Sequence, residues 1–275
     1  MTFREKLTHA EQTNRSLLCV GLDPDPARLA AKDVAAYLCA IVEATSDLVC
    51  AYKPNLAFYE QYGEAGYAAL RAVLRAIPSH IPVIGDAKRG DIAHTAAAYA
   101  RALFDELGFD AVTVNPYLGG DAVAPFLERT DRGVFIVCRT SNPGAVDLQD
   151  LPVTTESGTR PLYQAVAELA KRWNTNDNVG LVVGATYPEE MRRLRELCPR
   201  MPFLVPGIGP QEGELARAVL AGLDAQGAGI IVNAARSVIY ASDGADFAQA
   251  ARREAEALRD TIEEHRIAAQ AESRR

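Results

Sequence analysis

The chain has 275 residues, of which 48% are hydrophobic and 24% charged. A chain of this length and composition buries a large core, which excludes a disordered, collagen-like or coiled-coil protein. Acidic residues outnumber basic ones by 36 to 29, and the net charge of −7 argues against a nucleic-acid or anionic-membrane surface. Because the N-terminus is polar and no apolar run approaches the ~20 residues that span a bilayer, we expect a cytoplasmic protein.

The cysteines and histidines form no metal-ligand pattern. The five cysteines are odd in number, scattered and mostly within apolar runs, which is typical of reduced, buried thiols. The four histidines are isolated, and we interpret them as ordinary surface or core residues. The residues concerned are Cys19, Cys39, Cys50, Cys138, Cys198, His9, His80, His94 and His265. The sequence therefore predicts no metal site.

Short apolar runs alternate with longer segments of helical spacing along the whole chain. The predicted strands are residues 17–23, 48–53, 82–88, 111–115, 134–139, 179–183, 203–206 and 229–233. The predicted helices are residues 33–46, 64–77, 92–107, 121–129, 160–174, 188–197, 212–221 and 246–265. Strands that alternate with helices in this way lie parallel to their neighbours in an α/β sheet.

This pattern predicts a single-domain (β/α)8 TIM barrel that comprises residues 1–275. A doubly wound open sheet would also alternate, but eight evenly spaced units favour closure. One long unpatterned stretch, residues 140–159, follows the fifth strand and is a candidate lid over the catalytic face. The charged tail, residues 268–275, is expected to be frayed.

Charged residues terminate the first three predicted strands, and the carboxyl ends of the strands form the functional face of such a barrel. Asp23 ends the first strand, Lys53 the second, and Asp86 and Lys88 the third. Because side chains alternate along a strand, Asp86 and Lys88 share one face while Ala87 points towards the helices. The sequence thus predicts two aspartates and two lysines in one small volume at the barrel mouth.

Charged pairs of this kind are most often surface salt bridges. That interpretation fits poorly here, because the charges end three consecutive buried strands and are costly to desolvate unless they pair with one another. We therefore predict a catalytic or ligand-binding cluster. Its aspartates hold the lysines protonated, which makes one lysine a candidate proton donor.

The loops after the last two strands have the features of a phosphate site. The seventh strand continues into Pro206-Gly207-Ile208-Gly209-Pro210-Gln211, whose glycines allow close backbone approach to a ligand. Arg236 follows the eighth strand, and a guanidinium group pairs bidentately with phosphate. A glycine-rich turn alone can be purely structural, but barrels commonly bind phosphate with these two loops, which favours phosphate binding.

Together these residues resemble a known family, orotidine 5′-phosphate decarboxylase, and in particular its longer bacterial subgroup. The residues that carry the resemblance are Asp86-x-Lys88-x-x-Asp91-Ile92, Lys53-Pro54-Asn55 with Ala57-Phe58-Tyr59-Glu60, Pro206-Gly207-Ile208-Gly209 and Arg236. They occur in the family's order and cover nearly the whole chain, from Asp23 to Arg236. The resemblance implies a homodimeric barrel, free of metal and cofactor, that converts orotidine 5′-phosphate to UMP and carbon dioxide in the last step of de novo pyrimidine synthesis.

The resemblance also implies roles for single residues. Lys88 would protonate C6 of the pyrimidine, Asp86 would lie against the substrate carboxylate, and Lys53 would hold the charge network and a ribose hydroxyl. Asp91 would reach into the other subunit's site, so that the two subunits share their active sites. The implied substrate-binding residues are Asp23 for the ribose, Thr95 together with Asp91, Ser141 for the pyrimidine, and Gly207, Gly209, Gln211 and Arg236 for the phosphate.

Two residues depart from the family's pattern in the phosphate loop. Pro210 stands where the family generally has a residue with an N–H, which removes one backbone donor. Glu212 follows Gln211, where a small neutral residue is more usual. Asn115, at the end of the fourth strand, could also face the site, although no role follows for it.

Three other functions stay open. Metal-dependent aldolases and epimerase-like sugar-phosphate enzymes on the related barrel share Asp-x-Lys-x-x-Asp, but they need a carboxylate for magnesium, and Lys53 disfavours a cation. Schiff-base chemistry through Lys53 or Lys88 needs a lysine of lowered pKa, whereas neighbouring aspartates raise it. A phosphometabolite-binding protein without turnover would not need all four charges.

Overall fold

Eight parallel strands form one sheet in the computed structural model, which describes residues 1–29, 33–155, 158–207 and 212–273. Their order is β2-β1-β10-β9-β8-β5-β4-β3. The strands are β1 (Leu18–Gly21), β2 (Ala51–Lys53), β3 (Ile84–Arg89), β4 (Ala111–Val114), β5 (Gly133–Arg139), β8 (Val179–Val183), β9 (Phe203–Pro206) and β10 (Ile230–Ala234). Each of them overlaps one of the predicted strands.

The sheet closes between β2 and β3. Two parallel bridges join the edges, from Tyr52 to Val83 and from Asn55 to Asp86. The backbone N–H of Tyr52 also donates to the carbonyl of Pro82 at 3.1 Å. The closed (β/α)8 barrel is therefore confirmed, and the open doubly wound sheet is excluded.

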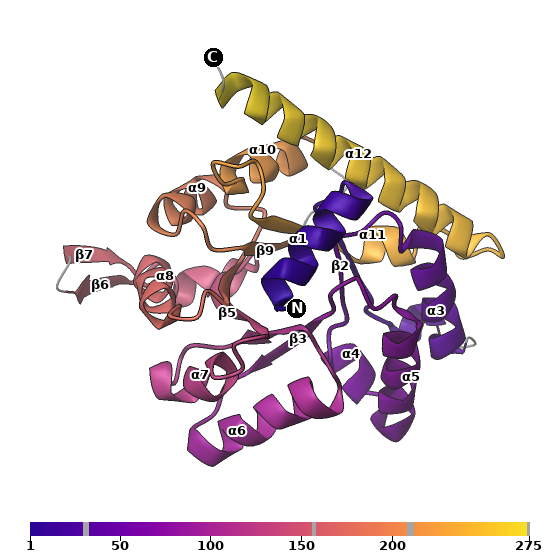
Figure 1. Ribbon diagram of the computed structural model, residues 1–275, viewed down its shortest axis with the longest axis horizontal. Coiled ribbons are helices and arrows are strands. Elements are labelled where there is room, and N and C mark those ends of the chain that lie inside the picture. Colours follow the sequence, from indigo (N-terminus) through magenta and orange to yellow (C-terminus); the bar gives the residue numbers. More distant parts are fainter. Residues whose placement is uncertain (30–32, 156–157, 208–211, 274–275) are drawn as a thin grey trace.

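Helices surround the barrel (Figure 1). They are α3 (Val34–Thr45), α5 (Gly63–Ala76), α6 (Ala93–Arg101), α7 (Gly120–Leu127), α8 (Leu162–Trp173), α9 (Pro188–Leu197), α10 (Glu212–Gly222) and α12 (Phe247–Ser273). All eight predicted helices are confirmed, and the one predicted over residues 92–107 ends in a π-helical turn, Ala102–Glu106. Four further helices were not predicted: α1 (Phe3–Asn14), α2 (Pro26–Leu29), α4 (Ala57–Glu60) and α11 (Arg236–Ile239).

The last helix continues beyond its predicted end. The predicted helix ended at residue 265, whereas α12 extends to Ser273, and the fraying expected from residue 268 stays a prediction. Near that end, the side-chain amide of Gln270 donates to the carbonyl of Gln226 at 3.0 Å, which ties the helix to the body of the barrel. In the part of the chain that the structure describes, no helix is both long and apolar enough to cross a membrane.

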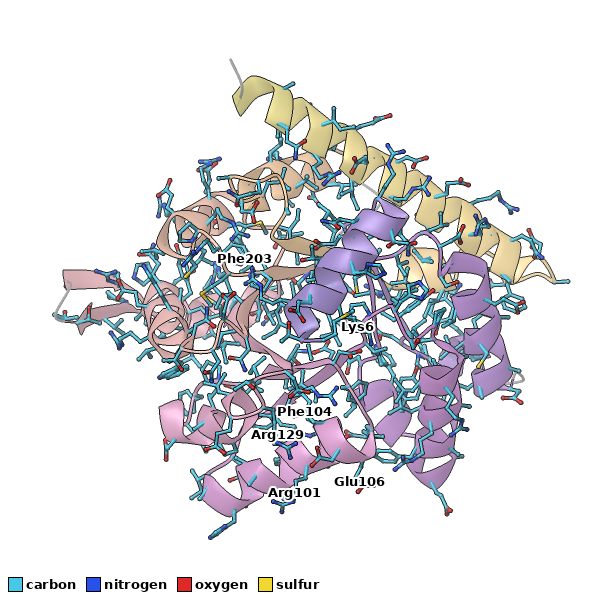
Figure 2. All side chains as sticks on the ribbon, in the orientation of Figure 1. Lys6, Arg101, Phe104, Glu106, Arg129 and Phe203 are labelled. Atoms are coloured by element: carbon cyan, nitrogen blue, oxygen red, sulfur yellow. The ribbon has the colours of Figure 1, made fainter. Side chains whose placement is uncertain are left out.

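The first helix closes the N-terminal end of the barrel, across which Figure 1 shows it lying. Phe3 and Leu7 are buried against the apolar side chains of the barrel interior. The ring of Phe3 meets that of Phe135 edge-on at 5.7 Å. Gly133 makes room for it, since a Cβ atom there would lie 2.5 Å from the Phe3 ring. Lys6, labelled in Figure 2, adds a 2.8 Å ion pair with Asp110.

The segment after β5 has more structure than predicted. It contains a 3₁₀-helix, Pro143–Asp147, and the strands β6 (Pro152–Thr155) and β7 (Gly158–Pro161). These two strands form an antiparallel pair that projects away from the barrel in Figure 1. Arg139 anchors the segment through a 3.0 Å ion pair with Asp150. Residues 140–159 therefore include regular secondary structure. Their role as a lid stays a prediction.

Candidate active site

Three of the four predicted charges form a chain of ion pairs at the barrel mouth. Asp86 lies between two ammonium groups, with Oδ2 3.1 Å from Lys53 Nζ and Oδ1 2.6 Å from Lys88 Nζ. Lys53 and Asp86 are buried, whereas the side chain of Lys88 is 48% exposed. Of the two lysines in this series of ion pairs, Lys88 is thus the one that a substrate can reach.

Lys88 reaches Asp86 through an irregularity in β3. The pairing of β3 with β4 shifts between Gly85 and Arg89, so that three β3 residues oppose the single β4 residue Thr113. Lys88 has a φ of 46°, a left-handed conformation that costs a residue with a Cβ atom roughly 1–2 kcal/mol. The prediction that Asp86 and Lys88 lie close together is confirmed, but the reason given for it, regular alternation along the strand, is wrong. Lys88 reaches Asp86 because β3 has a bulge at this point. Ala87 packs in the core outside the barrel, as predicted.

Ion pairing outweighs burial at both buried members of the cluster. Burial alone would lower the pKa of Lys53, but Asp86 and Asp23 raise it above its ordinary range. Burial would likewise raise the pKa of Asp86, but Lys53 and Lys88 hold it well below its ordinary range. Both groups are charged at neutral pH, which disfavours Schiff-base chemistry at Lys53 because that chemistry needs a neutral amine.

Asp23 joins this cluster from the loop after β1. Its Oδ1 atom accepts a hydrogen bond from the backbone N–H of Asn55 at 3.1 Å. Burial raises the pKa of Asp23, and the charge of Lys53 opposes that rise. Among the described residues, no hydrogen bond uses the other carboxylate oxygen, Oδ2. All four predicted charges therefore lie in one place, and Asp23 keeps an acceptor for a ligand.

The loops after β5, β8 and β9 meet at Ser141. A Cβ atom at Gly184 would lie 2.8 Å from the backbone nitrogen of Ser141. A Cβ atom at Gly207, where φ is 89°, would lie 3.2 Å from its Oγ atom. Glycine at positions 184 and 207 therefore allows the three loops to come this close. Ser141 and Gly207 lie near each other, as they must if both bind one ligand. The predicted residues outside the described part of the chain are Gly209, Pro210 and Gln211.

Three predicted residues lie apart from the charge cluster. Arg236 is exposed at the start of α11, in the loop region after β10. Asp91 lies after β3 and accepts a hydrogen bond from the backbone N–H of Ile92 at 2.8 Å. Thr95 is exposed on α6. Within the described residues of this chain, no hydrogen bond or ion pair links Asp91, Thr95 or Arg236 to the cluster.

The family model described as "Orotidine 5'-phosphate decarboxylase / HUMPS family" matches residues 16–252, which include the whole barrel from β1 to β10. The chain belongs to this family. The resemblance inferred from the Asp-x-Lys-x-x-Asp motif is thereby confirmed.

Relatives within the family match over nearly their full length. The orotidine 5′-phosphate decarboxylase of Thermomicrobium roseum is 56% identical over 96% of this chain and 95% of its own. That of Ralstonia nicotianae is 49% identical over 97% of this chain and 100% of its own. The solved structure of Leishmania donovani OMP decarboxylase has a TM-score of 0.86 at 44% identity, and covers 97% of this chain and 99% of that one.

Thr113 is a site residue that the motifs did not reveal. It is buried on β4, and its hydroxyl donates to Asp86 Oδ1 at 2.9 Å. Strand alternation offered a signal, because Thr113 shares a face with Asn115, which we did consider. Asn115 is exposed and its side-chain oxygen accepts from the backbone N–H of Tyr117 at 3.1 Å, so the inward polar group of β4 is Thr113.

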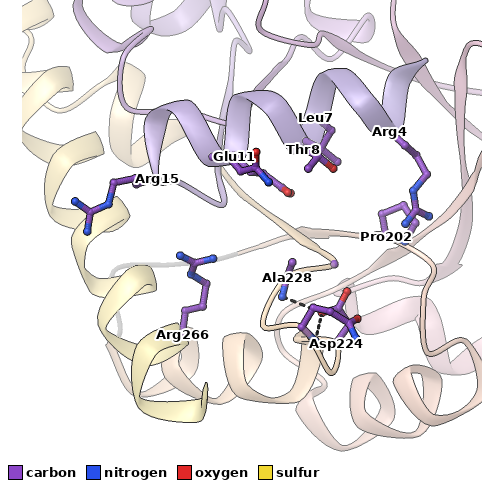
Figure 3. A pocket seen from close by; sticks show the side chains of 12 residues that line it. Arg4, Leu7, Thr8, Glu11, Arg15, Pro202, Asp224, Ala228 and Arg266 are labelled. Carbon is purple, nitrogen blue, oxygen red and sulfur yellow. Dashed lines mark hydrogen bonds between the residues drawn. The ribbon is translucent and has the colours of Figure 1, made fainter. Parts of the chain in front are cut away.

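A separate cavity of about 490 Å³ lies at the N-terminal end of the barrel (Figure 3). Its walls come from α1, α12 and the loop before β10, and none of the predicted site residues lines it. In Figure 3 Glu11 extends from α1 towards the side of the cavity that holds Asp224. Burial raises the pKa of Glu11 to about 8, and Asp224 adds to the rise, while Arg266 and Arg4 oppose it. This cavity therefore contains a carboxylate of raised pKa and lies apart from the charge cluster.

Replacing Glu11 by glutamine is expected to stabilise the protein at alkaline pH. The pKa of Glu11 rises from 4.5 in the unfolded chain to about 8 in the fold, so the native state binds more protons between these values and loses stability as the pH rises. Glutamine carries no such cost. The Tm of Glu11→Gln should exceed that of the wild type by a margin that grows from pH 5 to pH 8. The difference should reach several degrees and stay constant above pH 8.

Differential scanning fluorimetry across this pH range tests the prediction. Glu43→Gln removes an exposed carboxylate on α3 and serves as the matched control. A gain for Glu11→Gln that does not change with pH, or one equal to that of the control, would show that Glu11 titrates normally.

Proposed function

We propose that this chain converts orotidine 5′-phosphate to UMP and carbon dioxide, without a metal or cofactor, in the last step of de novo pyrimidine synthesis. The observation that carries this proposal is Asp86 between buried Lys53 and half-exposed Lys88 at the barrel mouth. Membership in the family supports the substrate, and the charge cluster supports the chemistry. The cytoplasmic location stays a prediction.

Lys88 has the two properties that the decarboxylation needs. When the bond from C6 to the carboxylate breaks, its electron pair stays on C6, and no neighbouring group of the ring accepts it. A fixed ammonium group stabilises this charge, because it needs no reorganisation during the reaction. Lys88 then transfers a proton to C6, which gives UMP, and the neutral amine regains a proton from solvent. Asp86, 2.6 Å away, holds the ammonium in place until transfer.

Asp86 has a second effect on the substrate. Its pKa is held well below its ordinary range by Lys53 and Lys88, against the effect of burial, so it is ionised at neutral pH in the free protein. A substrate carboxylate bound beside it is repelled, and the repulsion ends when carbon dioxide leaves. Binding elsewhere on the substrate must supply the energy for this contact.

The remaining predicted residues suit that binding. The free carboxylate oxygen of Asp23 can accept a hydrogen bond from a ribose hydroxyl. Ser141 and Gly207, which lie close together, would contact the pyrimidine and the phosphate, respectively. Arg236 would provide a guanidinium group for the phosphate, with Gly209 and Gln211, which precede α10 in the sequence, as further ligands. Phosphate binding far from C6 would then offset the cost of placing two carboxylates side by side.

We also propose a homodimer whose subunits share their active sites. Large apolar side chains are exposed after three neighbouring strands, β3, β4 and β5, on the face that holds the cluster. They are Ile92, Tyr117, Leu118, Val146, Leu148 and Leu151. Exposed apolar side chains concentrated on one face are typical of a protein interface. Asp91 lies in the same region, and no hydrogen bond or ion pair among the described residues links it to its own cluster. We therefore propose that an interface here brings Asp91 and Thr95 to the partner's site.

The proposed activity predicts a loss of orotidine 5′-phosphate absorbance when purified protein is added. Conversion to UMP should proceed at the same rate with and without a strong metal chelator, because Lys88 supplies the positive charge that a metal would otherwise provide. Chromatography of the products identifies UMP.

Two results would contradict the proposal. No conversion by folded protein would exclude the activity. Conversion that stops with the chelator and returns with magnesium would favour the metal-dependent sugar-phosphate chemistry. Against that alternative, the buried ammonium group of Lys53, 3.1 Å from Asp86, disfavours a cation beside this carboxylate.

A further inference from the structure

The bulge in β3 leaves the backbone of Lys88 without its usual partner. Residues 86–88 face the single residue Thr113 of β4, and regular pairing resumes only at Arg89. The N–H of Lys88 donates instead to the side-chain oxygen of Thr113 at 2.9 Å. The hydroxyl of Thr113 therefore replaces a missing bond of the strand ladder.

The same hydroxyl also binds the carboxylate of Asp86. A backbone N–H can only donate and an ionised carboxylate can only accept, so the Thr113 hydroxyl accepts from Lys88 and donates to Asp86 Oδ1. Asp86 Oδ1 in turn accepts from Lys88 Nζ at 2.6 Å. A closed ring of hydrogen bonds thus links both ends of Lys88 through Thr113 and Asp86.

We propose that Thr113 is a positioning residue of the decarboxylation, which holds the strained backbone of Lys88 and the carboxylate of Asp86 in register with each other. This inference rests on the proposed function. Thr113 is 1% exposed, so its effect passes through Lys88 and Asp86 and not through contact with substrate. Small displacements of a proton donor reduce the rate of the chemical step more than they weaken substrate binding.

Thr113→Val keeps the shape of the side chain and removes both hydrogen bonds. We expect kcat for orotidine 5′-phosphate to fall about 10- to 100-fold while KM changes by less than about threefold. Thr113→Ser keeps the hydroxyl and should restore most of kcat. Thr113→Ala, tested beside Thr113→Ser, gives the same comparison if valine prevents folding.

Thr45→Val is the matched control. Thr45 is another fully buried threonine whose hydroxyl donates to the carbonyl of Ile41, but it lies on α3, outside the site. This variant should lose stability and keep its kcat. The proposal is overturned if Thr113→Val keeps the wild-type kcat, if Thr113→Ser is as impaired as Thr113→Val, or if only Tm falls. Wild-type protein is measured in the same assay. An inactive wild type would contradict the proposed function, whereas an active wild type with an equally active Thr113→Val variant would contradict the role of Thr113.

Discussion

Replacing Lys88 by alanine is expected to abolish turnover of orotidine 5′-phosphate, with a loss of at least about 10⁴-fold in kcat. In the proposed mechanism, this variant would lack the group that both stabilises the charge on C6 and delivers the proton. Its fold should persist, because Lys88 is half exposed and Asp86 keeps its partners Lys53 and Thr113. UMP binding, measured by calorimetry, should also persist, since the ribose and phosphate ligands are unchanged.

Lys171→Ala is the control for the loss of a lysine. Lys171 is exposed on α8, far along the chain from the cluster, and its replacement should leave kcat unchanged. A Lys88→Ala variant with a rate near that of the wild type would remove Lys88 from the mechanism. A variant that is inactive and no longer binds UMP would instead indicate a role in holding the site together.

Mixing two inactive variants should restore activity if the protein is a homodimer whose subunits share their active sites, as we propose. Asp91→Ala and Lys88→Ala are each expected to be inactive alone. In a mixed dimer, one of the two sites combines the intact Lys88 of one subunit with the intact Asp91 of the other. Random exchange at equal concentrations makes half the dimers mixed, so the activity should reach about a quarter of the wild-type value.

The measurement is the rate of loss of orotidine 5′-phosphate after the variants are unfolded together and refolded, or co-expressed with different tags. Mass spectrometry of the refolded protein shows whether subunits have exchanged. Exchanged dimers that stay inactive would place Asp91 in its own subunit's site or outside the mechanism. Each variant refolded alone provides the baseline.

The repeating pattern of the chain was enough to predict the barrel. Apolar runs of strand length alternate with helical segments eight times, and every run became a strand of the closed sheet. The first helix was missed because it belongs to no strand-helix unit. The sequence nevertheless contained a sign of this helix, because Thr2 and Glu5 have the spacing of a capping box. Both hydrogen bonds of the capping box form in the structure.

The charge cluster could be predicted because strand ends in a parallel barrel converge on one face. The position of Lys88 could not be derived in the same way, since alternation describes a regular strand and β3 is bulged. A bulge depends on how β3 pairs with β4, which is a property of the folded sheet and not of either segment alone. Thr113 was missed for the same reason, because its hydroxyl matters only where the ladder is interrupted.

The first helix also affects how the protein folds during synthesis. Phe3 and Leu7 are synthesised more than 200 residues before Ile231, yet they lie with Phe135, Leu204 and Ile231 in one buried cluster. β1 likewise pairs with β10, through Leu18 and Val232. These contacts join distant parts of the sequence, and such contacts slow folding. A nascent chain therefore exposes the apolar face of its first helix until β10 is available, so the barrel closes only after β10 has left the ribosome, and the unfinished chain exposes apolar surface of the kind that favours aggregation.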